Sequence, residues 1–150
     1  MYQRILVPVD GSPTSAKGVE EATKLARLTG ANLRLFHSVE MSNIALGFDA
    51  YAANANDSLL LVREAGQRIL EQAAARVASG GVAVDTFLCE RAGEGVADLV
   101  IEQAKAWEAE LIVIGTHGRR GVGRLLLGST AEEVVRRSPV PVLLVRAMET

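Results

Sequence analysis

A chain of 150 residues is long enough to bury a core of its own, so we treat residues 1–150 as a single domain. Apolar residues make up 49% of it and charged residues 23%, and a formal net charge of −2 argues against a nonspecific nucleic-acid binder. The single cysteine, Cys89, excludes an intrachain disulfide, no apolar run reaches the roughly 20 residues of a membrane span, and the N-terminal residues lack a secretory signal pattern. We therefore expect a cytoplasmic protein without nucleic-acid or membrane partners.

Apolar runs alternate with amphipathic stretches along the chain, which predicts strands separated by helices. The first helix has the clearest ends, because Ser12 precedes Pro13 as an N-cap and Gly30 follows as a C-terminal stop. Asp57 is expected to cap a long second helix, and residues 40–56 before it have no periodicity and receive no assignment. In chain order we expect a strand at 5–9, a helix at 13–29, a strand at 32–39, a helix at 57–79, a strand at 82–89, a helix at 94–107, a strand at 111–114, a helix at 129–138 and a strand at 141–145.

This order of elements places a helix in every crossover between strands. Right-handed crossovers then give a parallel sheet that is covered on both faces, which is a doubly wound α/β domain with five strands and four helices. We expect the strand order 3-2-1-4-5. Ligands bind such sheets beyond the carboxyl ends of the strands, where the direction of winding reverses, here between the first and the fourth strand.

Residues 111–130 carry the strongest functional pattern of the chain. After a buried strand, glycines supply a loop that can approach a ligand closely, because no Cβ stands in the way. Ser129–Glu132 predicts a capping box that begins a helix, whose amide groups and positive dipole end would face the loop. Arg119, Arg120 and Arg124 would add positive charge. The stretch therefore predicts a cradle for an anion. Its glycines are Gly115, Gly118, Gly121, Gly123 and Gly128.

Two common phosphate-binding motifs do not fit this stretch. A Walker P-loop needs a lysine between its second glycine and the Ser or Thr, and Gly128–Ser129 has none. The G-x-G-x-x-G fingerprint fails because Leu126 occupies the third glycine position. The spacing Gly115-x2-Gly118-x9-Gly128-Ser129 instead resembles the nucleotide-binding signature of the universal stress protein family, in its ATP-binding branch.

The resemblance covers essentially the whole chain and implies a Rossmann-like fold that binds ATP, with any Mg²⁺ held mainly by the phosphates. The end of the first strand would form one wall of an adenine pocket, and the main chain at the end of the second strand would contact the base. The glycine loop and the following helix start would hold the phosphates. The implied binding residues are Pro8, Val9, Asp10, Ser38, Val39, Gly115, Thr116, His117, Gly118, Arg119, Arg120, Gly121, Gly128, Ser129 and Thr130.

Several of these side chains have a structural alternative. Asp10 can form an Asx-turn or cap the next helix instead of contacting a ligand. Ser129 and Thr130 can serve as helix caps as well as phosphate ligands. His37 is expected to be a hydrogen-bonded structural histidine, since no nucleophile motif lies near it, whereas the amide of His117 could face a phosphate.

The last strand of the predicted sheet should lie at an edge. Its residues 142–145 are apolar and lack the charges that usually protect an edge strand from pairing. A second copy of the chain would cover it, and the family resemblance implies a dimer through this strand. We therefore expect an isologous homodimer.

The sequence is compatible with three functions. The favoured one is a regulatory or protective stress-response protein that holds ATP and acts on a protein client the sequence does not identify. The second is slow ATP hydrolysis or self-phosphorylation on Ser129, Thr130 or His117, with Asp10 as the sole candidate base. The third is an interaction module whose site stays empty, and the intact glycine signature argues against it. No catalytic residue and no metal-ligand cluster is assigned.

Overall fold

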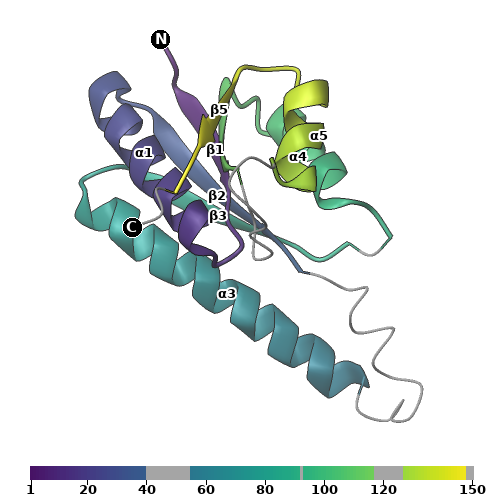
Figure 1. The fold of residues 1–150 in the computed structure, drawn as a ribbon. Helices are drawn as coiled ribbons and strands as arrows, with labels where there is room; N and C mark the ends of the chain where they lie inside the picture. Colours follow the sequence, from purple (N-terminus) through teal and green to yellow (C-terminus); the bar gives the residue numbers. More distant parts are fainter. Residues whose placement is uncertain (40–54, 92, 117–126, 148–150) are drawn as a thin grey trace.

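The computed structural model describes residues 1–39, 55–91, 93–116 and 127–147 (Figure 1). Every strand and helix that the sequence predicts is present, and the unassigned stretch 40–54 lies outside the described residues. The elements in chain order are β1 (Arg4–Pro8), α1 (Pro13–Thr29), β2 (Asn32–Ser38), α3 (Ala55–Ser79), β3 (Val84–Cys89), α4 (Val96–Ala106), β4 (Leu111–Gly115), α5 (Ser129–Arg137) and β5 (Val142–Val145).

The strands form one parallel sheet in the order β3-β2-β1-β4-β5, which confirms the predicted topology. The register is set around the first strand, where Ile5 pairs with Leu33 on β2 and with Leu111 on β4. The winding direction therefore reverses between β1 and β4, as expected. This reversal is what places the ends of these two strands beside each other.

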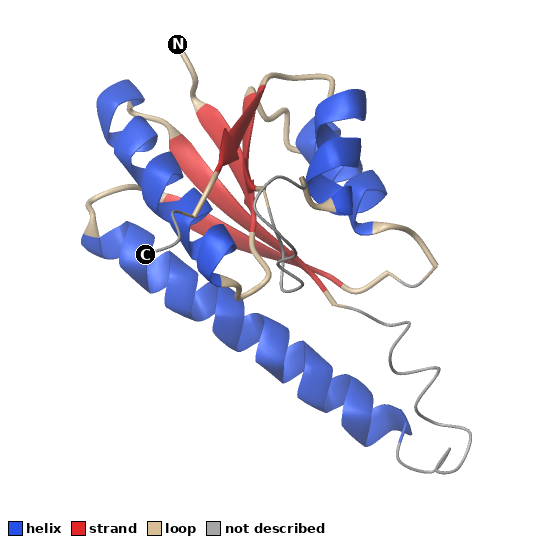
Figure 2. Cartoon of the chain, viewed as in Figure 1, coloured by secondary structure: helices blue, strands red, loops and turns tan. Residues whose placement is uncertain are grey.

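Helices cover both faces of the sheet (Figure 2). α1 and α3 pack on one face, where Ile5 and Val7 of β1 join their core, and α4 and α5 pack on the other, where Leu6 joins theirs. Because successive strand residues point to opposite faces, both directions of β1 meet apolar side chains. Ile5, Leu6 and Val7 are each 0% exposed.

The ends of α1 follow the sequence signals closely. Ser12 Oγ accepts a hydrogen bond of 3.1 Å from the Ser15 amide, and Pro13 takes the first helical position. At the other end Gly30 adopts a left-handed conformation with φ of 77° and donates its amide to Ala26 O at 2.8 Å. Both the predicted cap and the predicted stop are confirmed.

Three predicted boundaries are wrong by a few residues. Asp57 does not cap the second helix, because α3 already begins at Ala55 and Asp57 lies in its first turn. The third strand begins at Val84 rather than at residue 82, after the turn at Gly81. The third predicted helix begins at Val96 rather than at residue 94, because Gly95 is its extended N-cap.

Within the described residues, no helix is both long enough and apolar enough to cross a membrane.

Candidate functional site

The predicted binding residues that the structure describes gather beyond the carboxyl ends of β1 and β4. These strands are neighbours, since Leu6 pairs with Ile112. The turn after β1 leads into α1, and the chain after β4 leads to the start of α5. The end of β2 completes the group on the other side of β1. The described members are Pro8, Val9, Asp10, Ser38, Val39, Gly115, Thr116, Gly128, Ser129 and Thr130, while His117, Gly118, Arg119, Arg120 and Gly121 lie outside the described residues.

The two flanks of the predicted glycine loop meet at a direct main-chain hydrogen bond. The Gly128 amide donates to Thr116 O at 2.5 Å, and the Thr116 amide donates in turn to Val145 O on β5 at 2.9 Å. Thr116 therefore connects the end of β4 to the start of α5 and to the neighbouring strand. The expected proximity of the strand end and the helix start is confirmed for these flanking residues.

The start of α5 corrects the capping-box prediction. Gly128 is the N-cap, Ser129 lies one position inside the helix, and no side chain of the described residues forms a cap hydrogen bond here. The Glu132 amide bonds to Gly128 O at 2.9 Å, so the helix begins one residue earlier than a capping box on Ser129 requires. A helix start leaves its first amide groups without main-chain partners. In the described part of the chain no side-chain cap takes up these donors at α5, in contrast to α1, where Ser12 Oγ accepts from the Ser15 amide.

Thr116 adds a second polar group beside this helix start. It is 6% exposed, and its Oγ1 finds no hydrogen-bond partner among the residues the structure describes. A buried hydroxyl without a partner loses about 1–3 kcal/mol relative to a hydrogen-bonded one. A ligand oxygen or a water at this place would recover that free energy.

Gly115 serves a packing role that its place in the glycine signature does not indicate. A Cβ at this residue would lie 2.8 Å from Thr14 Cγ2 and 3.0 Å from the Thr14 carbonyl carbon and oxygen. Gly115 is not among the glycines with positive φ, and Gly128 has an ordinary φ of −58°. The absence of a side chain at Gly115 thus lets α1 approach the end of β4, rather than permitting an unusual backbone turn.

Asp10 forms the turn that the structural alternative predicted. Its Oδ1 accepts a hydrogen bond of 2.8 Å from the Ser12 amide, and its own amide donates to Ser15 Oγ at 3.2 Å. Gly11 between them has a φ of 83°. The Asx-turn is therefore confirmed, and a contact between Asp10 and a ligand remains a prediction.

His37 is a buried, hydrogen-bonded histidine, as expected. It is 8% exposed, and its Nδ1 lies 2.8 Å from Val9 O. Ser38 is the last residue of β2 and Val39 follows it, with the Val39 amide donating to Cys89 O on β3 at 2.9 Å. The bond between His37 and Val9 was missed at the sequence level, since nothing local to either residue indicates it.

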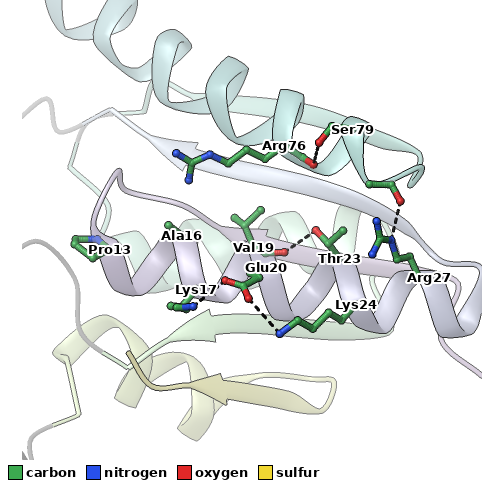
Figure 3. A pocket seen from close by; sticks show the side chains of 11 residues that line it. Pro13, Ala16, Lys17, Val19, Glu20, Thr23, Lys24, Arg27, Arg76 and Ser79 are labelled. Atoms are coloured by element: carbon green, nitrogen blue, oxygen red, sulfur yellow. Dashed lines mark hydrogen bonds and ion pairs between the residues drawn. The ribbon is translucent and has the colours of Figure 1, made fainter. Parts of the chain in front are cut away.

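A groove of about 560 Å³ lies elsewhere, between α1 and the C-terminal end of α3 (Figure 3). None of the predicted binding residues lines it. Lys17 and Lys24 both pair with Glu20, at 2.9 and 3.2 Å, and Arg27 Nε donates to Gly80 O at 2.7 Å. The hydrogen bond from Lys17, followed by that from Lys24, lowers the pKa of Glu20. Lys17, Lys24 and Arg27 thus have partners within the lining itself, and we assign the groove no ligand.

Metal-ligating side chains do not cluster in the part of the chain that the structure describes. No group of three or more His, Cys, Asp or Glu residues there is placed to hold an ion. Cys89, the only cysteine of the chain, is buried in β3 at 7% exposure and packs in the core under α4. It behaves as a small core residue, as the sequence suggested.

The fold is a Rossmann-like α/β sheet whose candidate site lies at the reversal point between β1 and β4. Residues 1–146 match the model of the universal stress protein family, and the chain belongs to this family. A universal stress protein of Methanocaldococcus jannaschii is 33% identical over 149 residues, which cover 97% of this chain and 83% of the relative.

Solved structures give the same result. A protein of the universal stress protein family from Burkholderia pseudomallei superimposes with a TM-score of 0.78 at 34% identity, over 97% of each chain. A universal stress protein in complex with cAMP superimposes with a TM-score of 0.69 at 25% identity, again over 97% of each chain.

Proposed function

We propose that the chain is a cytoplasmic stress-response protein that binds an adenine nucleotide, ATP, in the crevice between β1 and β4. The observation that carries the proposal is the uncapped start of α5, which the bond from the Gly128 amide to Thr116 O holds beside the end of β4. The related structure with cAMP adds support, because that ligand has an adenine base and a phosphate. The role we infer is regulatory or protective, with nucleotide occupancy as the signal.

The start of α5 supplies the chemistry that a polyphosphate requires. The amide groups of its first turn have no carbonyl partner within the helix and point out of its end, and the dipole places partial positive charge at the same end. A hydrogen bond to a charged group contributes about 1.5–3 kcal/mol. A micromolar complex corresponds to a binding free energy of about 8 kcal/mol. Several such hydrogen bonds together with burial of the base supply a free energy of this order after the cost of association is subtracted.

The remaining described residues divide between the two ends of the nucleotide. In the proposed arrangement, Val9 and Asp10 form a wall for the base, with Ser38 and Val39 adjacent to it. Thr116, whose buried Oγ1 lacks a partner among the described residues, lies on the phosphate side with the helix start. ATP would bring its own Mg²⁺, bound mainly through phosphate oxygens.

A pair of substitutions at Ser129 tests the amide cradle directly. Proline is well tolerated at the first position of a helix, and the Gly128 conformation before it, with φ −58° and ψ 149°, is compatible with proline. Ser129→Pro therefore removes one amide donor without disturbing the helix, whereas Ser129→Ala removes only the hydroxyl. We expect Ser129→Pro to weaken ATP binding by about 10- to 100-fold relative to Ser129→Ala, the equivalent of one charge-assisted hydrogen bond.

The measurement is titration calorimetry with ATP, ADP and AMP on the wild type and both variants. Mass spectrometry of small molecules released from freshly purified protein would show which nucleotide is retained. Equal affinities of the proline and alanine variants would contradict the cradle. A wild-type protein that neither retains nor binds any adenine nucleotide would remove the proposed function altogether.

We also propose that two copies of the chain pair through β5. This strand lies at the edge of the sheet, and its Leu143 and Leu144 are 41% and 37% exposed. Val135 on α5 is 45% exposed. An apolar edge without charges invites strand pairing, and an isologous contact would extend the sheet across both copies.

A further inference from the structure

Val9, the first residue beyond β1, is tied to β2 through both of its main-chain polar groups. Its amide donates to Phe36 O at 2.7 Å, and its carbonyl oxygen lies 2.8 Å from His37 Nδ1. Because a carbonyl oxygen can only accept, the proton of this bond must sit on Nδ1. Phe36 and His37, two successive residues of β2, therefore both hydrogen-bond to Val9, the residue that follows β1.

The imidazole replaces a main-chain donor at this point. In a regular parallel ladder, the carbonyl of Val9 would receive an amide N–H from the neighbouring strand. Here the side chain of His37 supplies the donor. Directly after Val9 the chain turns away from the sheet at Asp10 and Gly11, and Gly11 has a φ of 83°. The direction of the Val9 carbonyl thus depends on a side chain rather than on the ladder.

The opposite edge of the ring packs against the long helix α3. A Cβ at Gly66 would lie only 2.8 Å from His37 Cδ2 and 3.1 Å from Nε2, and 3.0 Å from Leu88 Cδ1. The ring is 8% exposed. It is therefore held between the Val9 carbonyl on one side and the backbone of α3 on the other, with little freedom to rotate.

We propose that His37 is a positioning residue for the base of the bound nucleotide, through its hydrogen bond to Val9 O. This inference rests on the proposed function, in which Val9 and Asp10 form the wall of the base pocket. The imidazole fixes the peptide plane between these two residues, and α3 fixes the imidazole through the close approach at Gly66. His37 does not itself touch the nucleotide in this arrangement.

Two substitutions of similar size separate the hydrogen bond from simple packing. Asn carries a donor, Nδ2, at the place of His37 Nδ1, whereas Leu is close to Asn in shape and has no donor. Both variants lose the ring and its contact with α3, so both should lower the melting temperature. AMP is the probe, since its single phosphate makes the base a larger share of the binding free energy.

We expect His37→Asn to bind AMP within about threefold of wild type and His37→Leu to bind at least about tenfold more weakly, the equivalent of one hydrogen bond. Calorimetry gives the dissociation constants, and thermal unfolding reports the stability of each variant separately. Equal dissociation constants for the two folded variants would overturn the inference. Absence of AMP and ATP binding in the wild type would instead overturn the proposed function.

Gly66→Ala tests the hydrogen bond between His37 and Val9 O without altering His37 itself. This variant replaces His37→Leu as the test if the leucine variant does not fold. The added methyl group would displace the imidazole from Val9 O, so we expect AMP binding to weaken by at least about threefold. A folded Gly66→Ala protein with wild-type affinity for AMP would overturn the inference. Gly95→Ala is the matched control, because its Cβ would meet only Asp98 Oδ2, at an ordinary 3.4 Å.

Discussion

The contact between α1 and the end of β4 is made by two glycines, and they should respond to alanine in opposite directions. At Gly115 an added Cβ would lie 2.8 Å from Thr14 Cγ2 and 3.0 Å from the Thr14 carbonyl carbon and oxygen. The carbonyl belongs to the first turn of α1 and cannot move without the helix. Overpacking of this kind typically costs about 1–3 kcal/mol of unfolding free energy.

Gly18 lies on the helical side of the same contact. Its added Cβ would lie 3.6 Å from the Gly115 amide nitrogen, an ordinary van der Waals distance. Alanine in a helix interior is favoured over glycine by about 1 kcal/mol, because glycine loses more backbone entropy on folding. Gly18→Ala should therefore stabilise the fold, whereas Gly115→Ala should destabilise it.

Thermal unfolding of both variants beside the wild type measures the difference. For a domain of this size, 1 kcal/mol shifts the melting temperature by about 2–4 °C. We expect an increase of about 2–4 °C for Gly18→Ala and a decrease of about 4–8 °C for Gly115→Ala, the latter for about 2 kcal/mol of strain. A Gly115→Ala protein as stable as wild type would show that α1 yields freely and would refute the reasoning.

Two further predictions concern the start of α1 and the edge of the sheet. Ser12→Ala removes the cap on the Ser15 amide and should lower the free energy of unfolding by about 1 kcal/mol. Urea denaturation measures this change, and the slope of the unfolding free energy against urea concentration should stay the same. A decrease below about 0.3 kcal/mol would contradict a stabilising role for the cap. Leu143→Lys on β5 should convert a dimer to a monomer in light scattering, whereas Leu28→Lys on α1, 82% exposed, should not. A wild-type monomer at micromolar concentration would contradict the proposed pairing.

Much of this fold is readable from local patterns. The ends of α1 are set by Ser12, Pro13 and Gly30, each of which acts on amide or carbonyl groups within four residues along the chain. An apolar run such as 111–114 likewise predicts a strand buried on both faces. Successive side chains of a strand point to opposite faces, so an unbroken apolar run places apolar side chains on both. The boundaries near 82 and 94 differ because Gly81 lies in a turn and Gly95 is an extended N-cap, whereas Asp57 lies in the first turn of a helix that already begins at Ala55.

The site was predicted in outline and corrected in detail. The spacing of Gly115, Gly128 and Ser129 indicated a strand end beside a helix start, and the bond from the Gly128 amide to Thr116 O confirms that proximity. The capping box failed, because the bond from the Glu132 amide to Gly128 O makes Gly128 the N-cap, and the helix already begins at Ser129. The main-chain bond to the end of β4 is made by Gly128 and not by Ser129, and a short motif does not indicate which of two adjacent residues makes such a long-range contact.

The sequence alone determined the order of the elements, the ends of α1 and the spacing of the glycine signature, because each depends on groups a few residues apart. Only the tertiary structure decided why residue 115 must be glycine, and that His37 supports Val9 while Gly66 confines its ring. These contacts join residues from different layers of the fold. Their distances are set by how closely helices and sheet pack, which no local pattern specifies.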